Sequence, residues 1–332
     1  MAVTGAGTPR RPPGPRALVL RALGLGDLLT AVPALRALRR GLPGHHIALA
    51  APRPLAPLAR LTGAVDDVLA AHGLAPLPAT GPPDVAVNLH GRGPASHQVL
   101  GALGPGRLLA FAHPELPAVG GPAWRPGEHE VDRWCRLLAW YGFAPDRDDL
   151  DLPPPPRRSP APGAVIVHPG AGYPARRWPA ERYATVAAAL RAAGLNVVVT
   201  GGPAETGPAR RVATLAGLPP RACRAGRTDV LDLTALVAGA RLVVCGDTGV
   251  GHLATAYRTP SVLLFGPTSP ALWGPPPHRA EHVVLWAGRD AGDPNAARPD
   301  RGLLAIRTGD VIAAALHSLT SLPTSTSPTR GL

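Results

Sequence analysis

Four glycine-rich segments contain the residues whose types and spacing point to chemistry. Each follows a short apolar run that predicts a buried strand, and in each a polar or charged side chain stands beside glycines. In chain order the segments hold Gly24, Gly26 and Asp27; Gly170, Gly172 and Arg176; Gly201, Gly202 and Glu205; and Asp247, Thr248, Gly249 and His252. Open α/β sheets bind ligands at the carboxyl ends of their strands, so these segments are the candidate site.

Asp27 has two interpretations. It stands at the predicted start of a helix, where an aspartate commonly caps free N–H groups and contributes about 0.5–2 kcal/mol. Alternatively, Gly24 and Gly26 leave room for a substrate hydroxyl to approach the carboxylate, which then acts as a general base. The glycines resemble the start of a dinucleotide fingerprint, but Leu29 occupies the third glycine position and the carboxylate would repel a pyrophosphate.

The segment 243–252 predicts an anion site. A buried strand leads into Asp247, a helix opens there, and two glycines leave the backbone N–H groups of residues 248–250 accessible. Those groups and the Thr248 hydroxyl can hold an anion, to which the helix dipole adds about 0.3–1 kcal/mol per charge. His252 follows within the first turn and can donate to the same anion. The alternative is an ordinary capped helix with a surface histidine.

Arg176 and Glu205 lie on the remaining two loops. Arg176 and Arg177 follow a strand, and either guanidinium can clamp a phosphate through two hydrogen bonds; the alternative is a pair of solvated arginines. Glu205 stands in the first turn of a helix, where it either stabilises the helix dipole or accepts hydrogen bonds from ribose hydroxyls. A nucleotide-diphosphate site would need this combination of groups.

Alternating apolar runs and helical patterns predict parallel α/β units. Strands are expected at 17–23, 47–51, 65–70, 85–89, 107–111, 164–167, 195–200, 241–245, 261–265 and 283–286. Helices are expected at 27–40, 131–141, 180–193, 204–216, 230–238, 249–257 and 310–319. A proline-rich stretch cannot join a sheet and acts as a stiff spacer. The expected order is therefore a disordered leader at 1–15, a domain at 16–151, a hinge at 152–163, a domain at 164–320 and a disordered tail at 321–332.

The composition excludes several classes of protein. Hydrophobic residues make up 45% of the chain, which excludes a disordered protein. The net charge of +12 comes from scattered arginines without any lysine, and aromatic residues are 4%, so no nucleic-acid partner is expected. Three cysteines without a C-x-x-C pair fit a cytoplasmic protein, and no apolar run is long enough to span a membrane. Peripheral contact with an anionic membrane at its inner face stays open through Arg36, Arg39 and Arg40; the alternative is a solvated helix surface.

From about residue 16 to residue 319 the chain resembles the ADP-heptose:lipopolysaccharide heptosyltransferases, glycosyltransferase family 9. The resemblance is carried by Gly26-Asp27, His129 to Gly142, His168-Pro-Gly through Arg176-Arg-Trp-Pro179, Gly246-Asp-Thr-Gly-Val-Gly-His252 and Leu264-Phe-Gly-Pro-Thr268. It implies an α/β protein of the GT-B fold, with two Rossmann-like domains that face an interdomain cleft. The first would be the acceptor domain and the second the nucleotide-sugar donor domain.

The resemblance also implies an inverting, metal-independent glycosyltransferase that needs no cofactor. It would move a heptose-like sugar from a nucleotide-diphosphate donor, ADP-linked in the family, to a hydroxyl of a glycan, lipid or natural-product acceptor. Asp27 matches the family's catalytic base, and Glu205 matches its ribose-binding carboxylate. Arg176 stands where members carry a lysine that holds the donor phosphates, which keeps the charge but changes its reach.

Two further parts of the resemblance concern the donor. The residues that match the motif around the donor's sugar and phosphates are Asp247, Thr248, Gly249 and His252. The loop from Gly170 to Gly172 lacks the hydroxyl side chains that members often carry. Phosphate contacts from this loop are therefore expected only from its backbone N–H groups.

Three other functions stay open. A metal-dependent transferase needs a D-x-D sequence, which 146–148 and 149–151 supply beside the hinge, where a solvated acidic loop is the alternative. An NAD(P)-binding oxidoreductase would use Arg53 for a 2′-phosphate, but Leu29 breaks its fingerprint. A non-catalytic nucleotide- or sugar-binding protein would keep the motifs of the second domain without needing Asp27.

Overall fold

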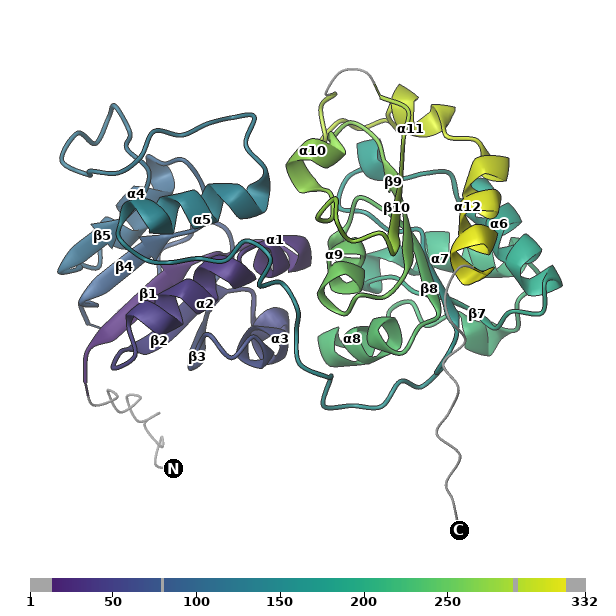
Figure 1. Cartoon of the computed structure of the whole chain (residues 1–332), viewed down its shortest axis with the longest axis horizontal. Coiled ribbons are helices and arrows are strands. Elements are labelled where there is room, and N and C mark those ends of the chain that lie inside the picture. Colours follow the sequence, from purple (N-terminus) through teal and green to yellow (C-terminus); the bar gives the residue numbers. More distant parts are fainter. Residues whose placement is uncertain (1–13, 79–80, 289–291, 321–332) are drawn as a thin grey trace, which may run out of the picture. The chain divides into compact units, whose positions relative to one another are not determined.

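The computed structural model describes residues 14–78, 81–288 and 292–320. Within them the chain forms two compact units, each built around one parallel β-sheet, as the sequence predicts (Figure 1). The first unit comprises residues up to Gly24, Ala31–Pro126 and Asp132–Arg147; the second comprises Leu25–Thr30, Gly127–Val131 and the chain from Asp148 onward. Residues 1–13 of the leader expected at 1–15, and the tail expected at 321–332, lie outside the described residues, and the hinge stays a prediction.

The first sheet has five parallel strands in the order β3-β2-β1-β4-β5. They are β1 Arg16–Leu20, β2 His46–Ala51, β3 Asp67–Ala70, β4 Val85–Asn88 and β5 Arg107–Leu109. In the central strand Val19 is opposite Leu49 on one side and Val87 on the other, and all three are fully buried. Central parallel strands are covered on both faces, which is why they read as continuous apolar runs.

Helices cover both faces of this sheet (Figure 1). They are α2 Val32–Gly41, α3 Ala56–Leu61, α4 Ala95–Gly101 and α5 Glu130–Trp140, with a 3₁₀ turn at Arg53–Leu55. The predicted single helix at 27–40 is wrong. The structure has α1 Leu25–Thr30 and then α2, because Pro33 lacks the N–H that a continuous helix needs. The short helices α3 and α4 were not predicted.

The second sheet is also parallel, in the order β10-β9-β8-β6-β7. Its strands are β6 Val165–His168, β7 Val197–Val199, β8 Leu242–Gly246, β9 Ser261–Phe265 and β10 His282–Trp286. The helices are α6 Ala180–Ala192, α7 Thr206–Leu215, α8 Val230–Ala238, α9 Gly249–Ala256, α10 Pro270–Trp273, α11 Arg301–Ala305 and α12 Thr308–Thr320. Figure 1 shows α8 and α9 on one face of this sheet and α6 and α12 on the other. Of these helices, α10 and α11 were not predicted.

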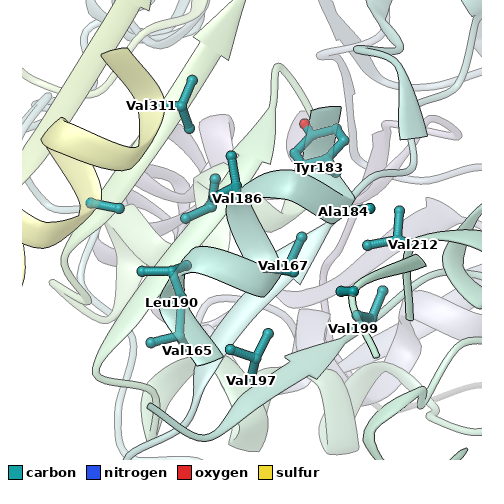
Figure 2. Packing of buried hydrophobic residues seen from close by; sticks show 14 of the residues in the cluster. Val165, Val167, Tyr183, Ala184, Val186, Leu190, Val197, Val199, Val212 and Val311 are labelled. Carbon is teal, nitrogen blue, oxygen red and sulfur yellow. The ribbon is translucent and has the colours of Figure 1, made fainter. Parts of the chain in front are cut away.

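The core of the second unit lies between the sheet and α6. Figure 2 shows Val186 and Leu190 of α6 among the valines of β6 and β7. All are buried, and each such side chain contributes about 1.5–3 kcal/mol when it leaves water. This packing fixes the strands whose carboxyl ends carry the candidate residues. Two of the predicted segments, 230–238 and 261–265, have the bounds that the structure shows for α8 and β9.

Candidate functional site

The candidate residues of the second unit follow three adjacent strands. The chain goes from β6 outward to β7 and then back to β8 on the other side of β6, so the direction of winding changes between β6 and β8. A parallel sheet opens a crevice for ligands at such a point, outside the carboxyl ends of its strands. The loop after β6 carries Arg176, and the loop after β8 carries Asp247 and Thr248.

The two arginines on the β6 loop have different surroundings. Arg176 ends a 3₁₀ turn, Pro174–Arg176, and its Nη1 lies 3.9 Å from Oδ2 of Asp247. Its Nε is buried and, among the described residues, has no hydrogen-bond acceptor. By contrast, Arg177 donates from Nε to the carbonyl of Ala171 at 2.9 Å. Arg176 is therefore the arginine that lies at the change of direction and keeps donors available.

Asp247 is a buried carboxylate with one cation beside it. Its side chain is 7% exposed. Burial raises the pKa of Asp247, and the Arg176 guanidinium together with a hydrogen bond from Thr268 opposes that rise. The negative charge of Asp27 raises the pKa of Asp247 further, which shows that the two carboxylates are close enough to repel each other.

Thr248 caps the helix that follows β8. Its backbone is extended, and its hydroxyl oxygen accepts a hydrogen bond from the Val250 N–H at 3.2 Å. The amide of Val250 is thus satisfied inside the helix, and the Gly251 N–H bonds to the Thr248 carbonyl. The donors at this helix end are the Thr248 hydroxyl proton and the N–H of Gly249, because the first N–H groups of a helix have no partner within it.

The glycines of this motif permit close packing of α1 on α9. A Cβ on Gly249 would lie 2.7 Å from Cβ of Leu25, and a Cβ on Gly26 would lie 2.8 Å from Cδ2 of His252. Real Cβ atoms essentially never come so close. A Cβ on Gly251 would lie 3.1 Å from Leu263. From the sequence, Gly249 and Gly251 leave the backbone open for an anion, and Gly26 leaves room for a substrate hydroxyl beside Asp27; the structure adds packing as a reason for all three.

Asp27 is the third residue of α1 and so lies in the first turn of this helix. Its carbonyl accepts the Thr30 hydroxyl at 3.1 Å, and the residue is half-buried. Gly24, one residue before α1, is exposed. The carboxylate thus lies in the first turn of a helix that packs on α9, where its charge acts on Asp247.

Trp273 is a site residue that the sequence did not indicate. Its ring lies edge-to-face on the imidazole of His252, with ring centroids 6.0 Å apart. Asp247, Thr248, His252 and Trp273 line one small cavity of about 10 Å³, which is room for about one water molecule. Thr268 ends the motif Leu264-Phe-Gly-Pro-Thr268, although no contact with Asp247 was predicted for it, whereas Trp273 is identified only by the packing of α10.

Glu205 lies in a niche formed by glycines. Its Oε2 accepts a hydrogen bond from the Gly202 N–H at 2.7 Å. A Cβ on Gly170 would lie 2.2 Å from the Glu205 carboxyl carbon, and one on Gly201 would lie 3.2 Å from its Cβ. At its other end, the loop places Gly172 against Arg176, where a Cβ would lie 3.1 Å from Nη2. The loop after β6 therefore contacts both Glu205 and Arg176.

His168 supports this niche from inside the sheet. The imidazole is buried, its Nδ1 lies 3.0 Å from the Thr200 hydroxyl, and its Nε2 lies 3.8 Å from Oε2 of Glu205. Burial lowers the pKa of His168, and the nearby Glu205 charge only partly opposes this. The sequence analysis used His168 as part of a motif but did not predict this contact.

The structure also shows the contacts of the D-x-D candidate and of the arginines considered for membrane contact. The carboxylate of Asp151, from the second D-x-D candidate, binds the guanidinium groups of Arg258 and Arg279, each at 2.8 Å. Asp151 thus anchors the chain before the proline-rich stretch, which is a structural role. In α2, Arg36 and Arg40 donate to backbone carbonyls, and Arg39 pairs with Asp66. Among the described residues, no helix is long and apolar enough to cross a bilayer.

The family described as glycosyltransferase family 9 (heptosyltransferase) matches residues 124–296. Lipopolysaccharide heptosyltransferase 3 of Escherichia coli is 33% identical over 168 residues, 49% of this chain and 49% of the relative. Lipopolysaccharide heptosyltransferase 1 of Pseudomonas aeruginosa is 35% identical over 168 residues, 46% of this chain and 43% of the relative. The chain thus spans about half the length of the curated relatives it matches.

Solved structures with this fold cover nearly the whole chain. The ADP-heptose lipopolysaccharide heptosyltransferase II of E. coli superposes with a TM-score of 0.74 at 21% identity, over 92% of this chain and 98% of that one. A family 9 glycosyltransferase from Veillonella parvula gives a TM-score of 0.75 at 21% identity, over 92% and 97%. These likenesses confirm the predicted GT-B fold class with two Rossmann-like domains.

Proposed function

The chain belongs to glycosyltransferase family 9, and we propose that it transfers a sugar from a nucleotide diphosphate to an acceptor hydroxyl. One observation carries the proposal. At the change of winding in the second sheet, a guanidinium with available donors lies beside an open helix N-terminus, and a glycine-lined carboxylate lies one strand away. These groups match the charges of a diphosphate and the hydroxyls of a ribose.

The diphosphate would bind to Arg176 and to the start of α9. The Arg176 Nη1 is 3.9 Å from Asp247, which is too long for a hydrogen bond, so its N–H groups can turn to phosphate oxygens. The Thr248 hydroxyl and the Gly249 N–H supply further donors, and the positive end of the helix dipole favours the negative charge.

The ribose would bind to Glu205. One carboxylate oxygen already accepts the Gly202 N–H, and this bond holds the group in place. The other oxygen can accept from a ribose hydroxyl. Gly170, Gly201 and Gly202 surround the carboxylate without side chains, so a sugar can approach it closely. His168 stays neutral at pH 7 because burial lowers its pKa.

The reaction would proceed with inversion at the anomeric carbon. Asp27 takes the proton of the acceptor hydroxyl while the hydroxyl oxygen forms the new bond to that carbon from the opposite face. The bond from the anomeric carbon to the diphosphate oxygen breaks, and the nucleoside diphosphate leaves with the electron pair. Arg176, Thr248 and the Gly249 N–H stabilise the charge that grows on this leaving group. These fixed positive groups do the work for which other transferases use a metal ion.

The activities of the related proteins indicate a donor and an acceptor for this chain. The relatives are lipopolysaccharide heptosyltransferases, and one structural neighbour is an ADP-heptose lipopolysaccharide heptosyltransferase. We therefore infer an ADP-linked, heptose-like donor. The acceptor belongs to the same chemical class as theirs, a hydroxyl of an envelope glycan or glycolipid.

A panel of ADP-, GDP-, UDP- and dTDP-sugars tests this function. A ligand present at 100 times its Kd stabilises the native state by about 2.7 kcal/mol, which thermal unfolding detects. The donor found in this way is then incubated with candidate acceptors and excess chelator, and the product's anomeric configuration is determined by NMR. We expect ADP-heptose to bind and the product to be inverted. The proposal fails if no nucleotide sugar binds, if the chelator abolishes transfer, or if configuration is retained.

A further inference from the structure

A second concave region lies at the opposite end of the second sheet. A cavity of about 440 Å³ opens where β7 begins and α6 ends, at the amino ends of the strands rather than at their carboxyl ends. Its walls include Leu195, Val197 and Leu218. Its volume falls in the range of about 300–1,000 Å³ that is typical of small-molecule sites.

Three arginines line this cavity, and none of the other described residues that line it is acidic. The three are Arg191, Arg221 and Arg224. Among the described residues none of the three side chains has a hydrogen bond or an ion pair, and the Arg224 Nε is buried without an acceptor. Arg211 of the same unit, by contrast, is paired with Glu181. An anion in this cavity would therefore meet three arginines that no acidic residue neutralises, one of which has a buried N–H without an acceptor.

The backbone holds two of these arginines in position. The Arg224 N–H donates to the Val199 carbonyl at 2.8 Å, which extends the edge of β7. Arg191 lies in the last turn of α6, and its Nη2 is 3.6 Å from where a Cβ on Gly217 would be, at the end of α7. The cationic groups are therefore attached to rigid elements and do not depend on a long loop.

The edge of β7 adds directional groups to the cavity. Val165 of β6 donates to the Asn196 carbonyl, and the outward-facing Val199 accepts from Arg224. Neighbouring residues of a strand alternate between its two edges, so Val197, which lines the cavity, presents its N–H and C=O on the outer edge. A ligand there meets both charge and hydrogen-bonding groups.

We propose that this cavity is a second anion-binding site, distinct from the candidate donor site, for a phosphate-bearing small molecule of roughly mononucleotide size. Arg191, Arg221 and Arg224 bind the phosphate, and the apolar wall at Leu195, Val197 and Leu218 covers the rest of the ligand. Guanidinium groups bind phosphate in bidentate fashion, which gives the site its preference for phosphate over other anions.

Hydrogen–deuterium exchange with inorganic pyrophosphate tests the proposal. The protein carries Arg176→Ala, so that the candidate donor site is weakened. We expect pyrophosphate to slow exchange at 191–198 and 218–224. The added change Arg191→Gln with Arg224→Gln should weaken this binding roughly tenfold or more, because each charged hydrogen bond contributes about 1.5–3 kcal/mol. Arg210→Gln is the matched control, since Arg210 lines a neighbouring cavity instead.

A second experiment measures binding to vesicles of phosphatidylglycerol. It distinguishes a soluble phosphate-bearing ligand from a lipid headgroup. Protection by free pyrophosphate supports a soluble ligand. Binding to vesicles alone, lost in the Arg191→Gln/Arg224→Gln protein but not in Arg210→Gln, supports a lipid headgroup as the phosphate. Absence of binding in both experiments overturns the proposal, and so does an equal loss in the Arg210→Gln control. Thermal unfolding without ligand shows that each variant is folded.

Discussion

The polar side chains at the carboxyl ends of the two sheets differ in how completely they are hydrogen-bonded within the protein. At the end of β4, Asn88 donates to the Gly91 carbonyl and the Ser96 hydroxyl, and the His97 ring bonds to the Phe111 carbonyl at 2.8 Å. All of these side chains are buried. At the ends of β6 and β8, by contrast, Arg176 keeps a donor without an acceptor and Asp247 is held 3.9 Å away from it.

This difference separates a structural network from a binding site. Hydrogen bonds that are complete within the protein stabilise it and leave nothing for a ligand. Buried charged groups that lack some of their hydrogen-bond partners gain free energy when a ligand supplies those partners. The presence of polar residues after a strand is therefore not enough to predict a binding site. Whether their hydrogen bonds are complete within the protein distinguishes a structural network from a ligand-binding site. The following changes should affect the two regions differently.

Asp27→Asn should have the largest effect. Loss of the general base lowers the rate of sugar transfer by about 10²–10⁴-fold, while donor affinity stays near that of the unmodified protein. Transfer to the acceptor identified in the panel and calorimetric titration of the donor measure the two quantities. Asp67→Asn, which changes an exposed carboxylate that binds Arg60 and the Val68 N–H, is the control. Near-normal turnover of the Asp27→Asn protein would contradict the assignment.

Arg176→Ala should weaken donor binding by roughly tenfold to a hundredfold, since a charged hydrogen bond contributes about 1.5–3 kcal/mol. Its neighbour provides a matched control. Arg177 donates to the Ala171 carbonyl, so Arg177→Ala should lower stability while changing donor affinity much less. Calorimetric titration with the nucleoside diphosphate checks both. Equal effects of the two changes would remove Arg176 from the site.

Gly170→Ala should displace Glu205, because the new Cβ would lie 2.2 Å from its carboxyl carbon. We expect a loss of donor affinity similar to that of Glu205→Ala, and no further loss when both changes are combined. Gly207→Ala is the control, since no atom lies within 4 Å of its Cβ and alanine favours a helix by about 0.5–1 kcal/mol. Additive losses in the double variant would show that Gly170 acts elsewhere.

Asn88→Ala should lower the free energy of unfolding by about 1–3 kcal/mol, because it leaves buried partners in the β4 network unsatisfied. Donor affinity should not change. Denaturant unfolding and the same titration measure these outcomes. An Asn88→Ala protein that loses donor affinity but keeps its stability would show that the β4 network binds the donor and is not merely structural.

The smallest effect concerns pH. Burial places the pKa of His168 in the folded protein below its ordinary value of 6.5. The unfolded chain therefore binds more protons than the folded one, and stability falls as the pH decreases below about 6.5. His168→Gln should flatten this fall in unfolding experiments between pH 7 and pH 5. A pH profile as steep as that of the unmodified protein would show that His168 does not titrate in this way.

Much of the fold could be predicted from the sequence because its strands are buried on both faces. Continuous apolar runs indicated the position of every described strand in both sheets, although β1, β3, β4, β5 and β7 are shorter than predicted. The short helices α3 and α4 have little apolar periodicity. The break between α1 and α2 depends on one proline, Pro33. The apolar residues keep a helical spacing across this break, so the spacing predicted one continuous helix.

The site was predictable only in part. Glycine patterns at strand ends indicated Arg176, Glu205 and the loop after β8, since these are features of local sequence. The choice between Arg176 and Arg177, and the contact of Trp273 with His252, depend on side-chain packing between distant segments. No spacing in the sequence records such contacts.

The most direct test of the central claim is hydrogen–deuterium exchange of the unmodified protein with saturating ADP, a ligand named for one structural neighbour. The account predicts slower exchange at 168–177, 200–206 and 246–252, with no change at 86–97, where the β4 network lies. No slowing at the three loops, or slowing centred on 86–97, would contradict it.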